Sequence, residues 1–215
     1  MQLSDCRTTL AGWLQDTSNV QWSSARLTTL LNLALRETMK HLLAIDPDCM
    51  KWTYTADTTV PSTGADNIYS YPAGTFAVHE IALSSDGVTY TPLRRRSLPI
   101  VRDYAKNGYS SDSVFVPYDA GHFMLYPSPT TAVTSGLRVI VAPTPVMTDD
   151  TDPFPLPLPF ETMALKEAQK FALWDVGEPT DHIQKEIERI KNESPRFYLT
   201  NDEPPVITPL ISRGY

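Results

Sequence analysis

The chain has 215 residues, of which 41% are hydrophobic and 20% charged, values that are ordinary for a globular protein of one or two domains. Its net charge is −7 and its pI is near 5.0, which excludes a protein that wraps nucleic acid, because such proteins are normally basic. An acidic surface still suits a protein that DNA passes without sticking.

The cysteines and the N-terminus indicate in which cellular compartment the protein is made. Cys6 and Cys49 are too few for a disulfide scaffold and lack zinc-site spacing, so we expect both to be reduced and partly buried. The N-terminus has no basic-then-apolar signal pattern, and no apolar run approaches membrane-spanning length. The sequence predicts a soluble protein that is assembled in the cytosol and has no membrane partner.

Two helices are predicted in the first 50 residues. Ser4 is the expected cap of a short helix, and Ser23 or Ser24 is the expected cap of a longer one that Pro47 ends. Apolar residues recur in both at helical spacing. They are Cys6, Leu10, Trp13 and Leu14 in the first helix, and Leu27, Leu30, Leu31, Ala34, Leu35, Thr38, Leu42 and Ile45 in the second.

The pattern then changes to short strands. "KWTYTADTTV" and "YSYP" have strand composition, and "AVHEIALSSDGVTYTPLRRR" reads as a hairpin that turns at Asp86-Gly87. "SLPIVRDYAKNG" predicts a short helix capped by Ser97. "SVFVPYDAGHFMLYPSP" predicts a second hairpin around Asp119-Ala120-Gly121, and "GLRVIVAPTPV" predicts a last strand.

Helical spacing returns after residue 159. The first of two helices carries its apolar face on Phe160, Ala164, Ala168, Phe171 and Trp174, and Gly177 closes it. The second begins at Thr180 or Asp181, has Ile183, Ile187 and Ile190 as its stripe, and ends at Pro195. The last 20 residues show no period and are predicted to be extended.

These elements predict an α+β protein. Neither helix pair can easily bury its stripe alone, so we expect residues 1–50 and 150–195 to form a discontinuous four-helix bundle. Residues 51–149 are then an inserted antiparallel β-rich domain, and residues 196–215 an extended C-terminal arm.

The segment "TDPFPLPLPFET" has proline at alternate positions from Pro153 to Pro159. In an extended chain these prolines remove N–H donors from one edge only, while Phe154 and Leu156 keep theirs on the other edge. The spacing contains no P-x-x-P, which argues against a ligand of SH3-like domains. We interpret the segment as a rigid strap that returns from the β-rich domain to the helices, with Pro159 as the first helical residue.

Catalytic motifs are missing from the sequence. "HEIAL" at residues 79–83 lacks the second histidine of a zinc protease, and Asp119 with His122 fits a turn with a neighbouring polar residue better than a metal site. There is no nucleophile elbow, phosphate loop or dinucleotide fingerprint. We therefore predict a protein that is not an enzyme, with no catalytic residues, no metal and no cofactor.

Two segments are candidate contact sites. Arg94, Arg95 and Arg96 are the only basic run; they are either solvated or paired with acidic neighbours, or they contact DNA or an acidic partner subunit. The C-terminal segment either covers its own helices or docks into another protein, since it is richer in apolar residues than most disordered tails. Its candidate residues are Phe197, Tyr198, Leu199, Val206, Ile207, Leu210, Ile211 and Tyr215.

The whole pattern resembles bacteriophage head-to-tail adaptor (connector, head-completion) proteins. The likeness rests on "LAGWLQDTSNVQWSSARLTTLLNLALRETMKHL", "YSYPAGTFAVHEIALSSDGVTYTPLRRRS", "GHFMLYPSPTTAVTSGLRVIVAPTPVMTDDTD" and "PLPLPFETMALKEAQKFAL". In such proteins a D-T-x-x-x-x-W-S-like turn joins two helices, a β domain carries Y-x-x-P and L-Y-P-x-P strands, and an L-P entry leads to a closing helix.

The resemblance implies a structural virion protein at the head–tail junction, assembled in the host cytoplasm. Such adaptors form rings, commonly of twelve copies, between the portal and the tail, and DNA passes through them without sequence-specific binding. The implied partners are the portal protein, neighbouring copies and tail or nozzle proteins, with residues 196–215 as the portal-facing arm. The alternative is a binding module whose β domain recognises a glycan or host surface through Tyr54, Tyr69, Tyr71 and Tyr118.

Overall fold

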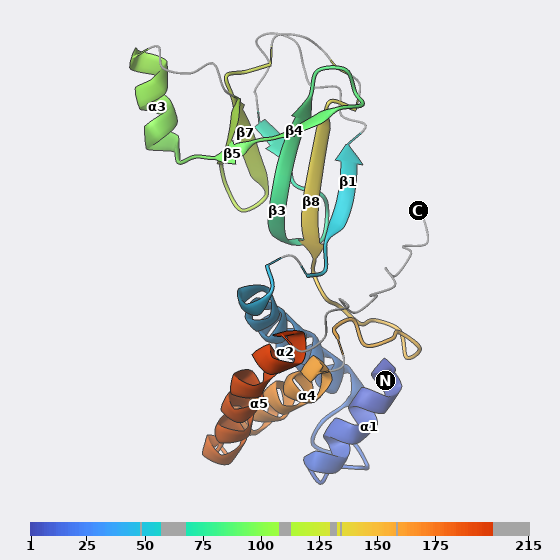
Figure 1. Ribbon diagram of the computed structural model, residues 1–215. Helices are drawn as coiled ribbons and strands as arrows, with labels where there is room; N and C mark the ends of the chain where they lie inside the picture. The colour runs from blue at the N-terminus through green and yellow to red at the C-terminus, as the bar shows by residue number, and fades with distance from the viewer. Residues whose placement is uncertain are drawn as a thin grey trace. The chain divides into compact units, whose positions relative to one another are not determined.

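The computed structural model describes residues 1–47, 49–56, 68–107, 113–129, 133, 135–157 and 159–199. The chain forms two compact units, which are described separately (Figure 1). The helical unit comprises Met1–Cys49 and Pro145–Tyr215, and the β unit is the continuous segment Met50–Thr144. With helices and two sheets largely in different parts of the chain, the predicted α+β class is confirmed.

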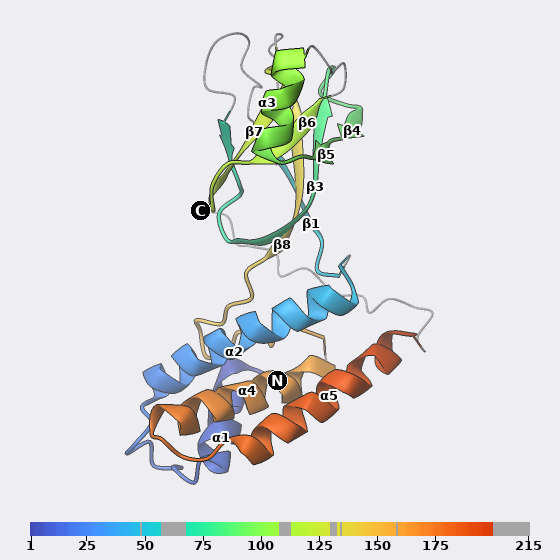
Figure 2. The ribbon, with the colours of Figure 1, turned by 90° about the vertical axis from the view of Figure 1, so that its left-hand side faces the viewer.

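Four helices make up the described part of the helical unit: α1 (Leu3–Trp13), α2 (Ser24–Ile45), α4 (Pro159–Asp175) and α5 (Asp181–Leu199). Helix α4 contacts each of the other three, and α1 also contacts α2 (Figure 2). Alanines at every fourth position of α4 lie on one side and leave room for the leucines of α2. The buried residues of these two helices include Leu27, Leu31, Leu35, Met39, Leu42, Phe160, Met163, Ala164, Ala168 and Ala172.

The helix starts agree only in part with the predicted caps. Helix α1 begins at Leu3 rather than after Ser4, and the N–H of its cap residue, Gln2, donates to a carboxylate oxygen of Asp5 at 3.1 Å. Ser4 is excluded as the cap because it already lies in the first helical turn. Ser23 caps α2, where its Oγ accepts a hydrogen bond from the N–H of Arg26 at 3.3 Å.

One carboxylate organises the loop between α1 and α2. Asp16 is buried and accepts hydrogen bonds from the backbone N–H groups of Val20, Gln21 and Trp22 at 2.9, 2.9 and 2.7 Å. These bonds, chiefly the one from Trp22, hold the pKa of Asp16 below its ordinary value. They also fix Trp22, which is 4% exposed, next to the start of α2. The D-T-x-x-x-x-W spacing therefore encodes a carboxylate-centred loop.

The proline-rich segment lies along the start of the chain. Leu3 donates a backbone hydrogen bond to the carbonyl of Asp152 at 3.0 Å, and Phe154 donates one to the carbonyl of Met1 at 2.8 Å. Phe154 thus uses the edge of the ribbon that alternating prolines leave intact. Helix α4 begins at Pro159, as predicted.

Asn32 of α2 holds the beginning of the same segment. Its Nδ2 donates to the carbonyl of Met147 at 2.9 Å, and its Oδ1 accepts the N–H of Met147 at 2.8 Å. A carboxylate oxygen of Asp152 accepts the N–H groups of Thr148 and Asp149 at 2.6 and 2.9 Å. Met147 is fully buried, so this return segment is an integral part of the helical unit.

Helix α5 continues through Pro195 to Leu199, so the prediction that Pro195 ends the helix is wrong. Pro195 lacks the N–H that would bond to the carbonyl of Lys191. The hydroxyl of Ser194 lies 3.1 Å from that carbonyl and 2.7 Å from the carbonyl of Ile190, and Nε2 of His41 lies 3.4 Å from the same hydroxyl. The helix continues because the carbonyl that proline leaves unpaired finds another donor in the Ser194 hydroxyl.

The β unit contains two four-stranded sheets. The first has the order β1-β8-β3-β4, with β1 (Trp52–Ala56), β8 (Leu137–Pro143), β3 (Thr75–Ser84) and β4 (Tyr90–Pro92). The second has the order β2-β7-β6-β5, with β2 (Ile68–Ser70), β7 (His122–Tyr126), β6 (Val114–Pro117) and β5 (Arg94–Arg95). The remaining helix, α3 (Leu98–Asn107), follows β5 (Figure 1).

One strand departs from the predicted antiparallel hairpins. The N–H of Leu93 still bonds to the carbonyl of Ile81 in the first sheet at 2.8 Å, but the N–H of Arg96 bonds to the carbonyl of Phe115 in the second at 2.9 Å. The chain therefore crosses between sheets here and enters the second one parallel to β6, with Arg94 opposite Val114. Within the strands that the structure describes, every other pair is antiparallel.

The core of the β unit lies between the sheets. Strand β6 is buried on both sides: Phe115 faces the core between the sheets, and Val114 and Val116 pack with Val101 of α3. This explains its continuous apolar sequence, whereas β7 alternates. The residues buried between the sheets are Tyr69, Ile81, Phe115, Phe123, Leu125, Leu137, Val139 and Val141.

Both predicted turns are built around aspartates. Asp86 Oδ1 accepts the N–H groups of Val88 and Thr89 at 2.8 and 2.7 Å, which places the pKa of Asp86 well below its ordinary value. Asp119 Oδ1 accepts the N–H of Gly121 at 2.7 Å and lies 2.7 Å from Nδ1 of His122. The turn interpretation of residues 119–122 is therefore confirmed.

Candidate interaction surfaces

The basic run predicted as a contact site lies at a sheet edge. Arg94 and Arg95 form β5, the last strand of the second sheet, and both side chains are exposed, whereas Arg96 is half-buried. Arg94 shares a face with Val114, on the side that α3 covers, and Arg95 shares the opposite face with Phe115. The structure thus places the arginines around an edge rather than on one flat surface.

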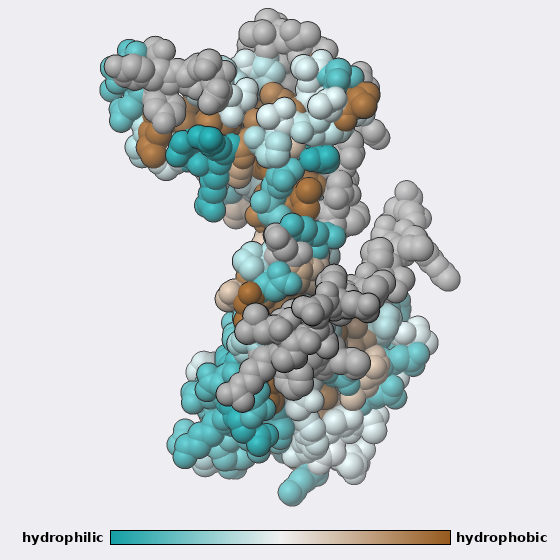
Figure 3. Space-filling model, viewed as in Figure 1, coloured by the Kyte–Doolittle hydropathy of each residue, from teal (hydrophilic) through white to brown (hydrophobic). Residues whose placement is uncertain are grey.

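Helix α3 adds two cations that the sequence reasoning missed. Arg102 and Lys106 are exposed and lie four residues apart, so they share one side of the helix. Helix α3 packs on β6, next to β5, so these residues and Arg94–Arg96 come from adjoining elements. We name the five residues together the basic strip. A strip of the most hydrophilic colour covers β5 beside α3 (Figure 3). The spacing of four residues between Arg102 and Lys106 in a predicted helix could have identified this pair from the sequence.

The basic strip has no ion-pair partner among the described residues. No carboxylate oxygen of a described residue lies within 4.0 Å of the charged nitrogens of its five side chains. The Nε of Arg96 is buried and lacks a hydrogen-bond partner. Arg95 lies close enough to Tyr71 to act on its pKa, which burial raises and the arginine partly offsets. The predicted pairing with acidic neighbours in the same chain is therefore absent from the described part of the chain.

The predicted C-terminal contact residues divide into two groups. Phe197, Tyr198 and Leu199 belong to the last turn of α5 and not to an extended arm. The other predicted residues lie outside the described part of the chain: Val206, Ile207, Leu210, Ile211 and Tyr215.

The tyrosines proposed for glycan or host-surface recognition do not form one exposed set. Tyr69 is 6% exposed and stacks on Phe123 in the core, with ring centroids 5.6 Å apart. Tyr71 is half-buried and also packs on Phe123. Tyr118 is 56% exposed, and the side chain of Tyr54 is not among those that the structure describes. The expectation of exposed aromatics is wrong for Tyr69, because its strand faces the core between the sheets.

Exposed apolar residues lie in or beside two loops of the helical unit. Val20 is 85% exposed in the loop between α1 and α2, and Trp174 is 73% exposed at the end of α4. Trp174 was predicted to lie on the buried face of its helix, and this is wrong. The last turn of α4 closes at Gly177, whose φ is 77°, and leaves the indole in solvent.

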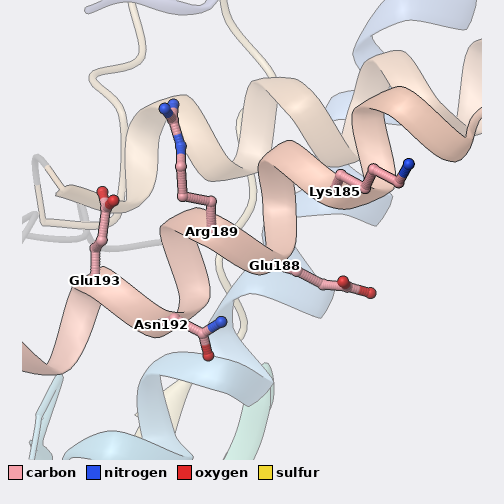
Figure 4. Close-up of a pocket in the computed structure, with 5 residues that line it drawn as sticks. All are labelled: Lys185, Glu188, Arg189, Asn192 and Glu193. Carbon is pink, nitrogen blue, oxygen red and sulfur yellow. The ribbon is translucent and has the colours of Figure 1, made fainter.

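A shallow, open hollow lies on the outer side of α5. Lys185, Glu188, Arg189, Asn192 and Glu193 line it, and all five come from this one helix. Arg189 and Glu193 point to one side and Asn192 to the other, so the side chains do not converge on a common point (Figure 4). This arrangement is that of a solvated helix surface and not of a ligand site.

The polar clusters that the structure describes have structural roles. Glu167 is 2% exposed and pairs with Lys170 and with Lys191, the latter at 3.4 Å, which joins α4 to α5. Glu80, of the segment that resembles the start of a zinc-protease motif, pairs with Arg138 of the neighbouring strand at 3.1 Å. Among the described residues, no group of three His, Cys, Asp or Glu side chains is placed to hold a metal ion.

Two general features accompany these surfaces. Cys6 and Cys49 are buried thiols, and burial raises the pKa of Cys6 to about 11, which leaves it unreactive as a nucleophile. In the residues that the structure covers, no helix combines the length and apolar character needed to cross a membrane.

Comparison with known proteins gives a match that spans both units. The sequence model of the family described as SU10 adaptor protein matches residues 1–193, which include every described strand and all of α1 to α4. This is a family of structural phage proteins and not a known class of enzymes. No curated protein matches the chain. The chain belongs to the SU10 adaptor protein family of phage head-to-tail adaptors.

Proposed function

We propose that the protein forms a ring between the portal and the tail of a phage particle, commonly of twelve copies, through which DNA passes. The observation that carries this proposal is the family match over residues 1–193, because it covers the whole β unit and the helical unit up to residue 193. In this proposal the four described helices of the helical unit form a bundle that holds the β unit in the ring. The net charge of −7 suits a channel along which DNA slides.

In this proposal residues 196–215 bind the portal. The family match ends at residue 193, so this assignment rests on composition and on the resemblance to adaptors. The side chains proposed to make contact are Phe197, Tyr198, Leu199, Val206, Ile207, Leu210, Ile211 and Tyr215. Arg94, Arg95 and Arg96 are proposed to contact DNA or a neighbouring copy. The protein then resides at the head–tail junction of the virion, is assembled in the host cytoplasm, and meets tail or nozzle proteins on its other side.

The test is assembly with the portal, followed by negative-stain electron microscopy. The full chain is expected to add a ring to the portal, and class averages give its copy number. The truncated chain should end at Leu199, because a stop at 195 would also remove the last turn of α5. We expect this variant to retain its helical circular dichroism and lose portal binding.

A control for length replaces residues 200–215 with a Gly/Ser segment of equal length. It should behave like the truncation, because the proposal assigns binding to the apolar side chains of the arm. Normal portal binding by either variant would refute the arm assignment alone. A full-length chain that adds no ring to the portal would refute the proposed function.

A further inference from the structure

The net charge of the chain is confined to one unit. The helical unit carries 11 Lys and Arg against 18 Asp and Glu, a net charge of −7, whereas the β unit carries 7 of each and is neutral. Within the neutral unit, 5 of the 7 cations lie in residues 94–106, together with only one carboxylate, Asp103. The β unit therefore has a local positive surface, and the helical unit has the excess of negative charge.

The two units also differ in how their cations are used. Six of the nine lysines and arginines whose side chains are described in the helical unit form an ion pair within the chain. None of the five cations of the basic strip does so within the described residues. Exposed single pairs contribute little to stability, so this contrast has little effect on folding. Within the part of the chain that the structure describes, the strip is therefore available to contact another molecule.

The position of the strip also suits a contact. Strand β5 is an edge strand, and its arginines project on both sides of that edge. Arginine is well suited to such a site, because its planar guanidinium can bind a carboxylate through two hydrogen bonds. A strip of the most hydrophilic colour lies over β5 (Figure 3).

We propose that the basic strip binds the acidic helical unit of a second copy of this chain, and so forms a head-to-tail contact within the ring. The inference rests on the proposed function and names the partner of Arg94–Arg96. A contact between two different surfaces is the kind that closes a ring by rotation. Charge complementarity alone fits both the acidic helical unit and DNA, and the proposed sliding of DNA through the channel favours the second copy. Five cations per copy without an ion pair among the described residues, repeated around a channel, would hold phosphates and oppose sliding.

The test compares two double charge reversals in the full chain. Arg94→Glu with Arg95→Glu alters the strip, and Lys185→Glu with Arg189→Glu is the matched control. The control changes the charge equally at exposed cations of α5 that have no ion pair within the described residues. Assembly on the portal is followed by mass photometry and electron microscopy, and binding to a short DNA duplex is followed by fluorescence anisotropy.

We expect the strip variant to need at least about tenfold more protein for ring assembly, because like charges then face each other. The control adds negative charge to the helical unit, which is the proposed acidic partner, so it should assemble at least as well as the wild type. Carbodiimide cross-linking of a mixture of isotope-labelled and unlabelled copies should join Lys106 to carboxylates of the helical unit in another copy. Duplex binding should be equally weak in all three proteins.

Three results would overturn the inference while the ring proposal stands. The first is unchanged assembly of the strip variant, and the second is an equal loss in the control. The third is a loss of duplex binding confined to the strip variant with normal assembly, which would assign the strip to DNA. Failure of the wild type to form a ring on the portal would refute the proposed function itself, and the inference with it.

Discussion

Replacement of Asn32 by alanine should loosen the segment that returns from the β unit to α4. The side-chain amide of Asn32 makes two hydrogen bonds with the backbone of Met147, one as donor at 2.9 Å and one as acceptor at 2.8 Å. Met147 is fully buried, so its N–H and carbonyl have no ready access to water. Alanine at position 32 would leave both groups without their partner.

The size of the effect follows from these two groups. A buried polar group that loses its partner costs about 1–3 kcal/mol, and we take about 1–2 kcal/mol each because Asn32 is half-exposed and water can enter. Alanine recovers about 0.6 kcal/mol through its higher helix propensity. The net loss is about 1.5–3.5 kcal/mol, and at about 1.4 kcal/mol per tenfold it corresponds to roughly 10- to 300-fold faster amide exchange at Met147.

Hydrogen exchange resolved at residues 145–150 measures this directly, and helical circular dichroism on heating reports the helical unit. Asn192→Ala is the matched control, since Asn192 is an exposed residue of α5 and carries the same propensity gain. Asn32→Asp keeps an oxygen for the N–H of Met147 but sets a second oxygen against its carbonyl, and should also destabilise. Unchanged exchange at Met147 in Asn32→Ala would refute the reasoning.

Three further predictions concern charge and backbone. Asp16→Asn should lower the melting temperature at pH 7 and reduce the fall of the melting temperature below pH 3.8. A carboxyl whose pKa is lowered by folding stabilises the fold at pH values above its ordinary pKa and loses that contribution in acid. Melting curves from pH 2 to 7 test this. His41→Gln should reduce the loss of stability as pH falls through 6.5. Burial, and to a lesser extent the positive charge of Lys191, lower the pKa of the imidazole in the folded protein and favour its neutral form. Melting curves from pH 5 to 8 test this. Pro195→Ala should raise the stability of the end of α5 by up to about 3 kcal/mol, and unchanged exchange protection at residues 196–199 would contradict it.

The features that the sequence predicted well depend on neighbours along the chain. The stripe of α2, the Ser23 cap, the Asp86 and Asp119 turns and the helical start at Pro159 all arise from residues within a few positions of one another. Local spacing and the chemistry of caps and turns are enough to specify these features.

The features that could not be predicted from the sequence depend on residues that are far apart along the chain. Helix α5 passes Pro195 because Ser194 supplies a donor, and the imidazole of His41, 153 residues away, lies 3.4 Å from the Ser194 hydroxyl. Arg94 joins the second sheet because β6 is available there as a parallel neighbour. The basic strip, likewise, is evident only after α3 is placed beside β5. Periodicity in one stretch of sequence cannot report such long-range pairings.

Because the β unit is inserted into the helical unit, folding the helical unit requires the two ends of the insertion to come together, which costs chain entropy. The pairing of the first and last strands of the β unit reduces this cost. Closing a flexible loop of about 95 residues would cost about 4 kcal/mol more than closing a very short one. In the β unit, Trp52 near its start pairs with Val141 near its end, so a folded β unit holds its two ends side by side. The helical unit then has only a short gap to close. The bonds of Asn32 to Met147 and of Leu3 to Asp152 hold the returning chain from that point, and the alternating prolines reduce the freedom it would otherwise lose.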